Sequence, residues 1–286
     1  DVVRERAYDP DRDADGPGYS NGGGRTNPEE RYSEPRLGEV EGWNGEELLT
    51  YFTQFDASES SRVYCAATST VALAVLGGPD ALEALVRRLR SQIIGGRTPK
   101  EPGKDRMEAI EAENRLGSLL EKIDGRDVRP EDLGDLVTVM ANLYNAQKNQ
   151  GAGQEASREM MNLVRRTERD LAAPPRDAQA MKRFVEDELR PGEAIRSSVD
   201  LSRDNRNDHA ILIGKDARGR TFVYDPWPKV AGPEEDGVHR LRSQLVYQDK
   251  NPQQFDDYLE KMIAYPGLWI DGQSAGHITG GRVYGF

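Results

Sequence analysis

Residues 209–227 read HAILIGKDARGRTFVYDPW. The apolar runs 209–213 and 221–224 predict two strands, because β-branched, aliphatic and aromatic residues dominate them. The polar, glycine-containing segment between the runs is typical of a hairpin turn. The hairpin therefore puts His209 at the start of one strand and Asp225 at the end of the next, 225 − 209 = 16 residues later.

The other informative stretch is SSRVYCAATSTVALAVLGG, residues 60–78, which contains Cys65, the single cysteine of the chain. Small and apolar residues dominate it and a Gly-Gly pair closes it, so it predicts a buried helix. With Ser60 or Ser61 as N-cap, Cys65 lies in about the first helical turn. The partial positive charge of a helix N-terminus favours a thiolate there. The alternative is that Cys65 is an ordinary small core residue.

Taken together, these stretches supply a helix-borne cysteine, a histidine that opens a strand and an acid that closes the next one. Cys65, His209 and Asp225 thus form a Cys-His-Asp set, in which a base activates the nucleophile and an acid orients the base. The context of each residue suits its role, which favours a catalytic site over an isolated buried thiol.

The rest of the chain predicts helices first and antiparallel strands later, which is an α+β arrangement. Residues 1–40 have the composition of a flexible linker, and folded structure begins near Trp43 as one domain over 41–286. The expected helices are 44–52, 79–93, 104–123, 131–148, 154–171, 177–189 and 252–264, and the further strands are 194–201, 238–246 and 278–284. The helical block at about 97–190 reads either as scaffold or as an insertion that binds a partner or substrate.

Composition limits the classes of partner and site. The chain of 286 residues has a net charge of −11, which disfavours nucleic acid and anionic membranes. A single cysteine excludes an internal disulfide, and three widely spaced histidines make no zinc signature. No apolar run reaches the roughly 20 residues of a membrane span, and no signal peptide is evident. Residues 22–24, Gly-Gly-Gly, lack the context of a phosphate loop, so we expect no cofactor.

At this point the chain resembles a known family, the papain-like thiol peptidases, and within it the bacterial branch that includes double-glycine, or bacteriocin-processing, peptidases. The resemblance rests on the cysteine-led helix, a Pro-Gly-Glu-Ala-Ile segment from Pro191, and the histidine hairpin ending in Asp-Pro-Trp. It covers roughly 43–78 and 190–228. It implies a papain-like core with a helical insertion, with Cys65 as nucleophile, His209 as general base and acid, and Asp225 as the residue that orients the imidazole.

One position departs from the family pattern. The family usually carries a glutamine about six residues before the cysteine as an oxyanion donor, but this chain has Glu59 there. An ionised carboxylate cannot donate a hydrogen bond. Gln54, eleven residues before Cys65, is the remaining candidate, or else a solvent-exposed loop residue. The departure leaves room for glutamine deamidation or transglutamination through the same thioester.

Three further residues are weaker candidates for the catalytic site. His239 is expected on a strand flank in a structural or solvent-exposed role, and His277, in a turn that enters a strand, is the rival base. Trp227 either walls the cleft or only caps the core.

The sequence thus predicts a cysteine-dependent hydrolase that cleaves an amide of a protein or peptide without a cofactor. The linker-like start, without methionine, indicates a released bacterial effector or toxin domain, secreted or delivered and otherwise cytoplasmic, with an activating or inhibitory (immunity) protein as a further partner. The first alternative is a glutamine deamidase or transglutaminase on the same fold. The second is a non-catalytic interaction module that uses helices 104–189 as its binding surface.

Overall fold

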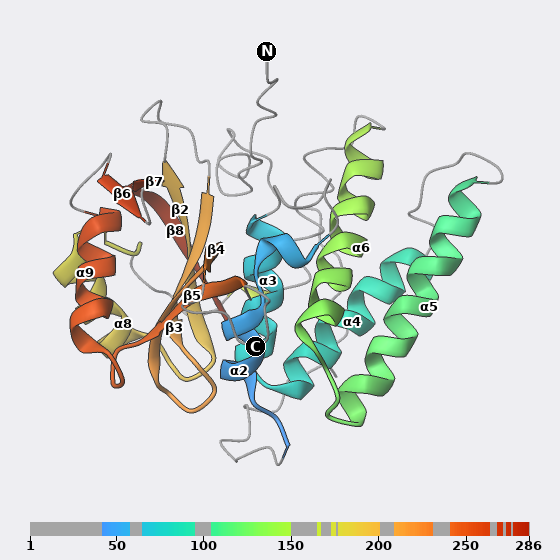
Figure 1. Cartoon of the computed structure of the whole chain (residues 1–286), viewed down its shortest axis with the longest axis horizontal. Helices are drawn as coiled ribbons and strands as arrows, with labels where there is room; N and C mark the ends of the chain where they lie inside the picture. The colour runs from blue at the N-terminus through green and yellow to red at the C-terminus, as the bar shows by residue number, and fades with distance from the viewer. Residues whose placement is uncertain are drawn as a thin grey trace, which may run out of the picture.

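The computed structural model describes residues 42–57, 65–94, 104–149, 165–166, 173–175, 177–200, 209–230, 241–263, 268–270, 273–275 and 277–285. The fold is α+β, as the sequence predicts. A central antiparallel sheet is covered by helices on both faces (Figure 1). The predicted linker 1–40 lies outside the described residues.

The main sheet has the strand order β1-β8-β2-β3-β4-β5, and each neighbouring pair is antiparallel. The bounds of its strands are β1 Arg165–Arg166, β2 Glu193–Asp200, β3 His209–Lys215, β4 Thr221–Val230, β5 Leu241–Tyr247 and β8 His277–Gly285. The predicted hairpin is confirmed, since β3 begins at His209 and pairs with β4. A separate small hairpin joins β6 Leu268–Ile270 to β7 Gln273–Ala275.

The face of the sheet formed by Leu212, Phe222 and Tyr224 packs on helix α3, Cys65–Leu76. Every residue of α3 is buried, as expected for a helix that is apolar on all sides. It ends before a glycine with a positive φ of 99° at Gly78, so the predicted Gly-Gly stop is confirmed.

Four more helices enclose α3 on this side of the sheet: α2 Gly45–Tyr51, α4 Pro79–Ile94, α5 Lys104–Asp124 and α6 Pro130–Asn149. The predicted helical block shares one hydrophobic core with α3 and the sheet, because Leu116, Leu133 and Leu136 belong to it. This shared core supports the scaffold interpretation of the block.

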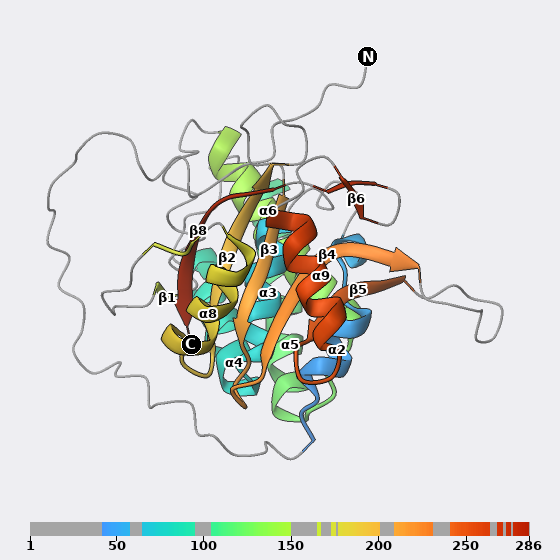
Figure 2. The ribbon, with the colours of Figure 1, turned by 90° about the vertical axis from the view of Figure 1, so that its left-hand side faces the viewer.

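The opposite face of the sheet carries helices α8 Ala178–Glu188 and α9 Pro252–Ile263, which lie in front of the strands in Figure 2. Their apolar side chains, including Phe184 and Phe255, pack on Ile211, Ile213 and Val223. The strands thus present alternate residues to two different cores.

Two predictions of local structure were wrong. Residues 165–166, expected inside a helix over 154–171, form strand β1, because pairing with Tyr284 and Gly285 of β8 overrides the local helical periodicity. The rest of that expected helix lies outside the described residues. Asp225 does not end its strand, since β4 continues to Val230 after a break in pairing between Asp225 and Lys229. The other expected helices and strands are present with small changes of boundary.

Candidate active site

The start of α3 lies against the start of β3, which brings Cys65 to His209. Cys65 and Ala66 pack on Ala210, the residue after the histidine. One turn further along the helix, the hydroxyl of Ser69 donates to the carbonyl oxygen of Ala210 at 3.3 Å. Because His209 is the first residue of its strand, its ring is at the strand end, within hydrogen-bonding reach of the thiol.

His209 and Asp225 form a buried pair at the edge of the hairpin. The distance from Nε2 of the imidazole to Oδ1 of the carboxylate is 2.6 Å. Since Nε2 is taken by the acid, Nδ1 is the ring nitrogen left for Cys65. The pair therefore fixes which imidazole nitrogen is available to Cys65.

The carboxylate of Asp225 accepts two further hydrogen bonds. Its Oδ1 accepts from the backbone N–H of Trp227 at 2.9 Å, just where β4 stops pairing with β5. Its Oδ2 accepts from the hydroxyl of Tyr258 on α9 at 2.5 Å. Three donors thus satisfy a carboxylate that is buried away from water.

Burial and charge act in opposite directions on this pair. Burial lowers the pKa of His209, but the charge and hydrogen bond of Asp225 and the neighbouring Cys65 outweigh it and raise that pKa to about 10. For Asp225, burial raises the pKa, but His209, Tyr258 and the Trp227 N–H together hold it below its usual range. The site therefore favours an imidazolium beside a carboxylate.

Aromatic rings form one wall next to the histidine. The indole of Trp227 meets the imidazole edge-on, with 6.4 Å between ring centroids, and meets the ring of Phe55 in the same way at 5.8 Å. Trp227 is 39% exposed, so this wall reaches the surface beside His209. The structure agrees with a Trp227 that walls the site rather than one that only caps the core.

Gln54 begins a short 3₁₀ helix, η1, Gln54–Asp56, in the same neighbourhood. Its side chain is only 5% exposed, so the interpretation of Gln54 as a solvent-exposed loop residue is wrong. Its Oε1 has no hydrogen-bond partner among the described residues, so the side chain keeps unused hydrogen-bonding capacity inside the protein.

Several contacts hold the segment that carries η1. The hydroxyl of Tyr224 donates to the carbonyl oxygen of Phe52 at 3.0 Å, and Asp56 caps η1 by accepting from the N–H of Thr53 at 2.6 Å. On the other side, the backbone of Asp56 lies against Gly134 of α6, where a Cβ would come 2.2 Å from the Asp56 carbonyl oxygen. Helix α6 thus supports the loop next to the site.

Sequence reasoning missed two polar residues of this site. Tyr258 lies within the predicted helix 252–264, and its spacing to Phe255 and Leu259 carries no signal that its hydroxyl meets Asp225. Gln244 pairs in register with Asp225 across β4 and β5, and its buried Nε2 has no partner among the described residues. Register between these strands is a long-range property that a local pattern does not reveal.

Two further histidines were candidates from the sequence. His239 lies outside the described residues. His277 begins β8, where its backbone pairs with Asp200 of β2, and β2 separates β8 from β3. The side chain of His277 is also outside the described part of the structure.

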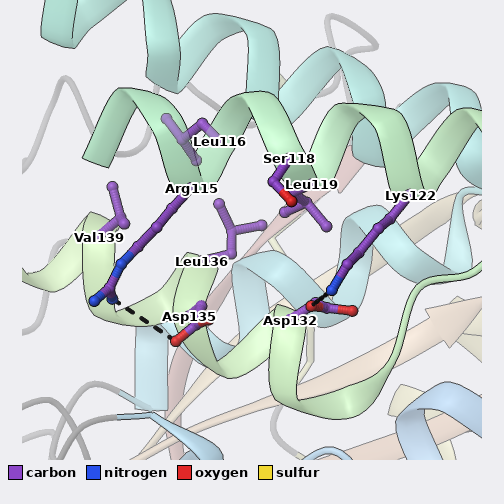
Figure 3. Close-up of a pocket in the computed structure, with 9 residues that line it drawn as sticks. All are labelled: Arg115, Leu116, Ser118, Leu119, Lys122, Asp132, Asp135, Leu136 and Val139. Atoms are coloured by element: carbon purple, nitrogen blue, oxygen red, sulfur yellow. Dashed lines mark hydrogen bonds and ion pairs between the residues drawn. The ribbon is translucent and has the colours of Figure 1, made fainter. Parts of the chain in front are cut away.

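A hollow of about 120 Å³ lies between α5 and α6, away from the candidate site residues (Figure 3). Its cations are paired across the two helices, Arg115 with Asp135 at 3.8 Å and Lys122 with Asp132. Its floor is formed by leucines of the hydrophobic core, such as Leu116. The hollow is therefore interpreted as a crevice between two packed helices.

Over the described ranges, no cluster of three or more His, Cys, Asp or Glu residues is arranged to hold a metal ion. Nor does that part of the chain contain a helix that is both long and apolar enough for a membrane span. Chemically, a thiol, an imidazole and a carboxylate arranged in this way can act as a nucleophile, a proton carrier and an orienting acid. Comparisons of the chain with protein-family models, with curated proteins and with solved structures found no significant match.

Proposed function

We propose that the chain is a cysteine-dependent hydrolase that attacks an amide carbonyl of a protein or peptide and passes through a thioester. The observation that carries this proposal is the buried His209–Asp225 pair at 2.6 Å, with Cys65 as a second neighbour of the same imidazole. Burying an ion pair of this kind costs free energy, and groups with such perturbed pKa values cluster at catalytic sites. This interpretation also explains why the single cysteine lies at the start of α3, next to the start of β3.

In the first half of the reaction, the Sγ thiolate of Cys65 attacks the carbonyl carbon, and the carbonyl π bond opens to an oxyanion. When the tetrahedral intermediate collapses, the C–N bond breaks. The imidazolium of His209 gives its Nδ1 proton to the leaving amine. Asp225 stays ionised and keeps the ring oriented throughout.

In the second half, neutral His209 takes a proton from water, and the resulting hydroxide adds to the thioester carbonyl. Collapse breaks the C–S bond and releases the carboxylic acid. The proton carried by His209 balances the thiolate that leaves, so the thiolate–imidazolium pair is restored.

The oxyanion needs hydrogen-bond donors on the same side of the site. Cys65 is the first residue of α3, and the helix's own hydrogen bonds do not use the N–H groups of a first turn. The side chain of Gln54, buried on η1, is the candidate second donor through its Nε2 amide group. Removing one such donor typically lowers turnover by about 10²–10³-fold.

The first test is the rate of alkylation of Cys65 by iodoacetamide as a function of pH, in the unsubstituted protein and in His209→Ala. An ordinary thiol carries less than about 1% thiolate near pH 6, so rapid reaction there requires a paired imidazolium. We expect reaction at about pH 6 that falls at least tenfold in His209→Ala. If the alkylation rate in both proteins depended on pH as for an ordinary thiol, Cys65 would be structural and the proposal would be refuted.

The second test identifies the reaction. The protein and its Cys65→Ala variant are each incubated with a protein mixture, and the products are compared by mass spectrometry. New chain termini that depend on Cys65 support amide cleavage of a backbone. Ammonia release without new termini would replace this proposal by glutamine deamidation or transglutamination, and a lack of any Cys65-dependent product would favour a non-catalytic module.

A further inference from the structure

Tyr258 contacts the candidate site from the side of the sheet opposite to α3. It lies on α9 and is only 7% exposed, and its hydroxyl donates to Oδ2 of Asp225 at 2.5 Å. The site is thus assembled from both faces of the sheet, with the thiol on one helix and this hydroxyl on another.

The ring of Tyr258 is held firmly in place. Phe255 and Leu259 on the same helix are fully buried in the core between α9 and the sheet. An ion pair between Lys182 of α8 and Asp256 of α9 at 2.8 Å ties the two helices together. The hydroxyl therefore has a fixed position from which to hold the carboxylate.

This contact matters because the terminal torsion of an aspartate is soft and roughly two-fold. Oδ1 of Asp225 serves His209 and the N–H of Trp227, whereas Oδ2 has the Tyr258 hydroxyl as its donor. If that hydroxyl were removed, Oδ2 would be buried without this donor. Rotation of the carboxylate about its terminal torsion would then exchange Oδ1 and Oδ2. The imidazole would then lose its fixed acceptor.

We propose that Tyr258 is a positioning residue of this site, which locks the carboxylate of Asp225 so that the imidazole of His209 presents Nδ1 to Cys65. The inference rests on the proposed cysteine-dependent function. Tyr258 acts through Asp225 and does not contact the substrate. Helix α9 thereby becomes part of the catalytic apparatus rather than a cover for the sheet.

The test compares Tyr258→Phe with a matched control, Tyr247→Phe. Tyr247 is also a buried tyrosine, 3% exposed, whose hydroxyl donates to a carboxylate, Oδ2 of Asp216, at 3.3 Å. The control therefore removes a comparable hydrogen bond elsewhere in the fold. The readout is the pH profile of Cys65 alkylation in the full chain.

In Tyr258→Phe, Asp225 loses a donor that stabilises its ionised form, so it takes up a proton at higher pH. We expect the acid side of the alkylation profile to move up by on the order of one pH unit, which is about a tenfold lower rate on that side. Tyr247→Phe should leave the profile unchanged. A loss of stability alone would not move the acid side in only one of the two variants.

The outcomes separate this inference from the function on which it rests. If alkylation depends on His209 but Tyr258→Phe matches the unsubstituted protein, the inference is overturned and the hydrolase proposal stands. If alkylation does not depend on His209, both are overturned. Should Tyr258→Phe fail to fold, the unsubstituted protein labelled with ¹³C at tyrosine Cζ gives the answer. The signal of Tyr258 should then move when the pair titrates, and an unmoved signal would refute the inference.

Discussion

The charge on His209 predicts how the stability of the protein depends on pH. Burial opposes that charge, but Asp225 and, to a smaller extent, Cys65 hold the pKa of His209 at about 10, above its ordinary value of 6.5. The folded protein therefore keeps a proton that the unfolded chain gives up. We choose pH as the perturbation and apply it to Cys65→Ala, so that the imidazole proton of the pair is followed without the thiol.

The sign of the effect follows from this raised pKa. The stability that protonated His209 contributes is fully present below about pH 6.5 and is lost as pH rises through the folded-state pKa. One proton held by the folded state alone lowers the free energy of unfolding by about 1.4 kcal/mol per pH unit. Because Cys65→Ala removes the smaller contribution of Cys65 to the raised pKa, we expect a loss of at most about 2–3 kcal/mol between about pH 7 and pH 9. Asp225, whose pKa is lowered, contributes stability that is lost only toward acid pH, outside this window.

The assay is urea unfolding followed by tryptophan fluorescence at several pH values, and the reference protein is Cys65→Ala/His209→Gln. Other titrating groups are shared by the two proteins, so the difference between their free energies of unfolding isolates His209. We expect this difference to shrink as pH rises. Parallel pH dependences in the two proteins would show that His209 is neutral in the folded state, and the electrostatic argument for the site would be refuted.

The remaining predictions concern the surroundings of the site. In Gly134→Ala, the new Cβ would lie 2.2 Å from the carbonyl oxygen of Asp56, so η1 must move; we expect a loss of about 1–3 kcal/mol in urea unfolding and slower Cys65-dependent turnover. Gln54→Ala should lower turnover by about 10²–10³-fold and leave alkylation of the thiol unchanged, whereas equal turnover would exclude Gln54 as an oxyanion donor. Asp216→Ala removes a buried carboxylate that accepts from the N–H groups of Arg218 and Arg220, and it should cost about 1–3 kcal/mol, measured by its urea midpoint, without moving the pH profile of alkylation.

Much of the fold could be predicted because local patterns and tertiary packing agree over most of the chain. The apolar runs 209–213 and 221–224, with a polar turn between them, predicted a hairpin, and the small-residue run after Cys65 predicted a buried helix with its glycine stop. The histidine and the acid could be assigned to one site because a tight hairpin keeps the starts and ends of its strands together. Arg165 and Arg166 escaped prediction, because their strand exists only through the edge of β8, far away in the sequence.

The polar contacts around Asp225 and Gln54 were less predictable than the positions of Cys65 and His209 on their helix and strand. Tyr258 reaches Asp225 across 33 residues, and Gln54 is buried because α6 and the sheet enclose η1. Neither fact follows from residue type or local spacing, because the partner of a tyrosine or glutamine side chain is decided by tertiary packing with distant parts of the chain. Sequence spacing can propose that a carboxylate orients a histidine, but it does not say what orients the carboxylate.

The arrangement of the two cores explains why the site lies at one end of the hairpin. The core on the α3 side positions Cys65 and the segment before η1, while the core on the α9 side positions Tyr258 behind Asp225. The hairpin β3–β4 contributes alternate residues to both cores. His209 therefore has Cys65, held from the α3 side, as one neighbour and Asp225, held by Tyr258 from the α9 side, as the other. Interiors are close-packed and transmit small displacements, so a cavity in either core would shift one partner of the His209 imidazole relative to the other. Precision at the imidazole is therefore a property of the whole three-layer fold rather than of the Cys-His-Asp residues alone.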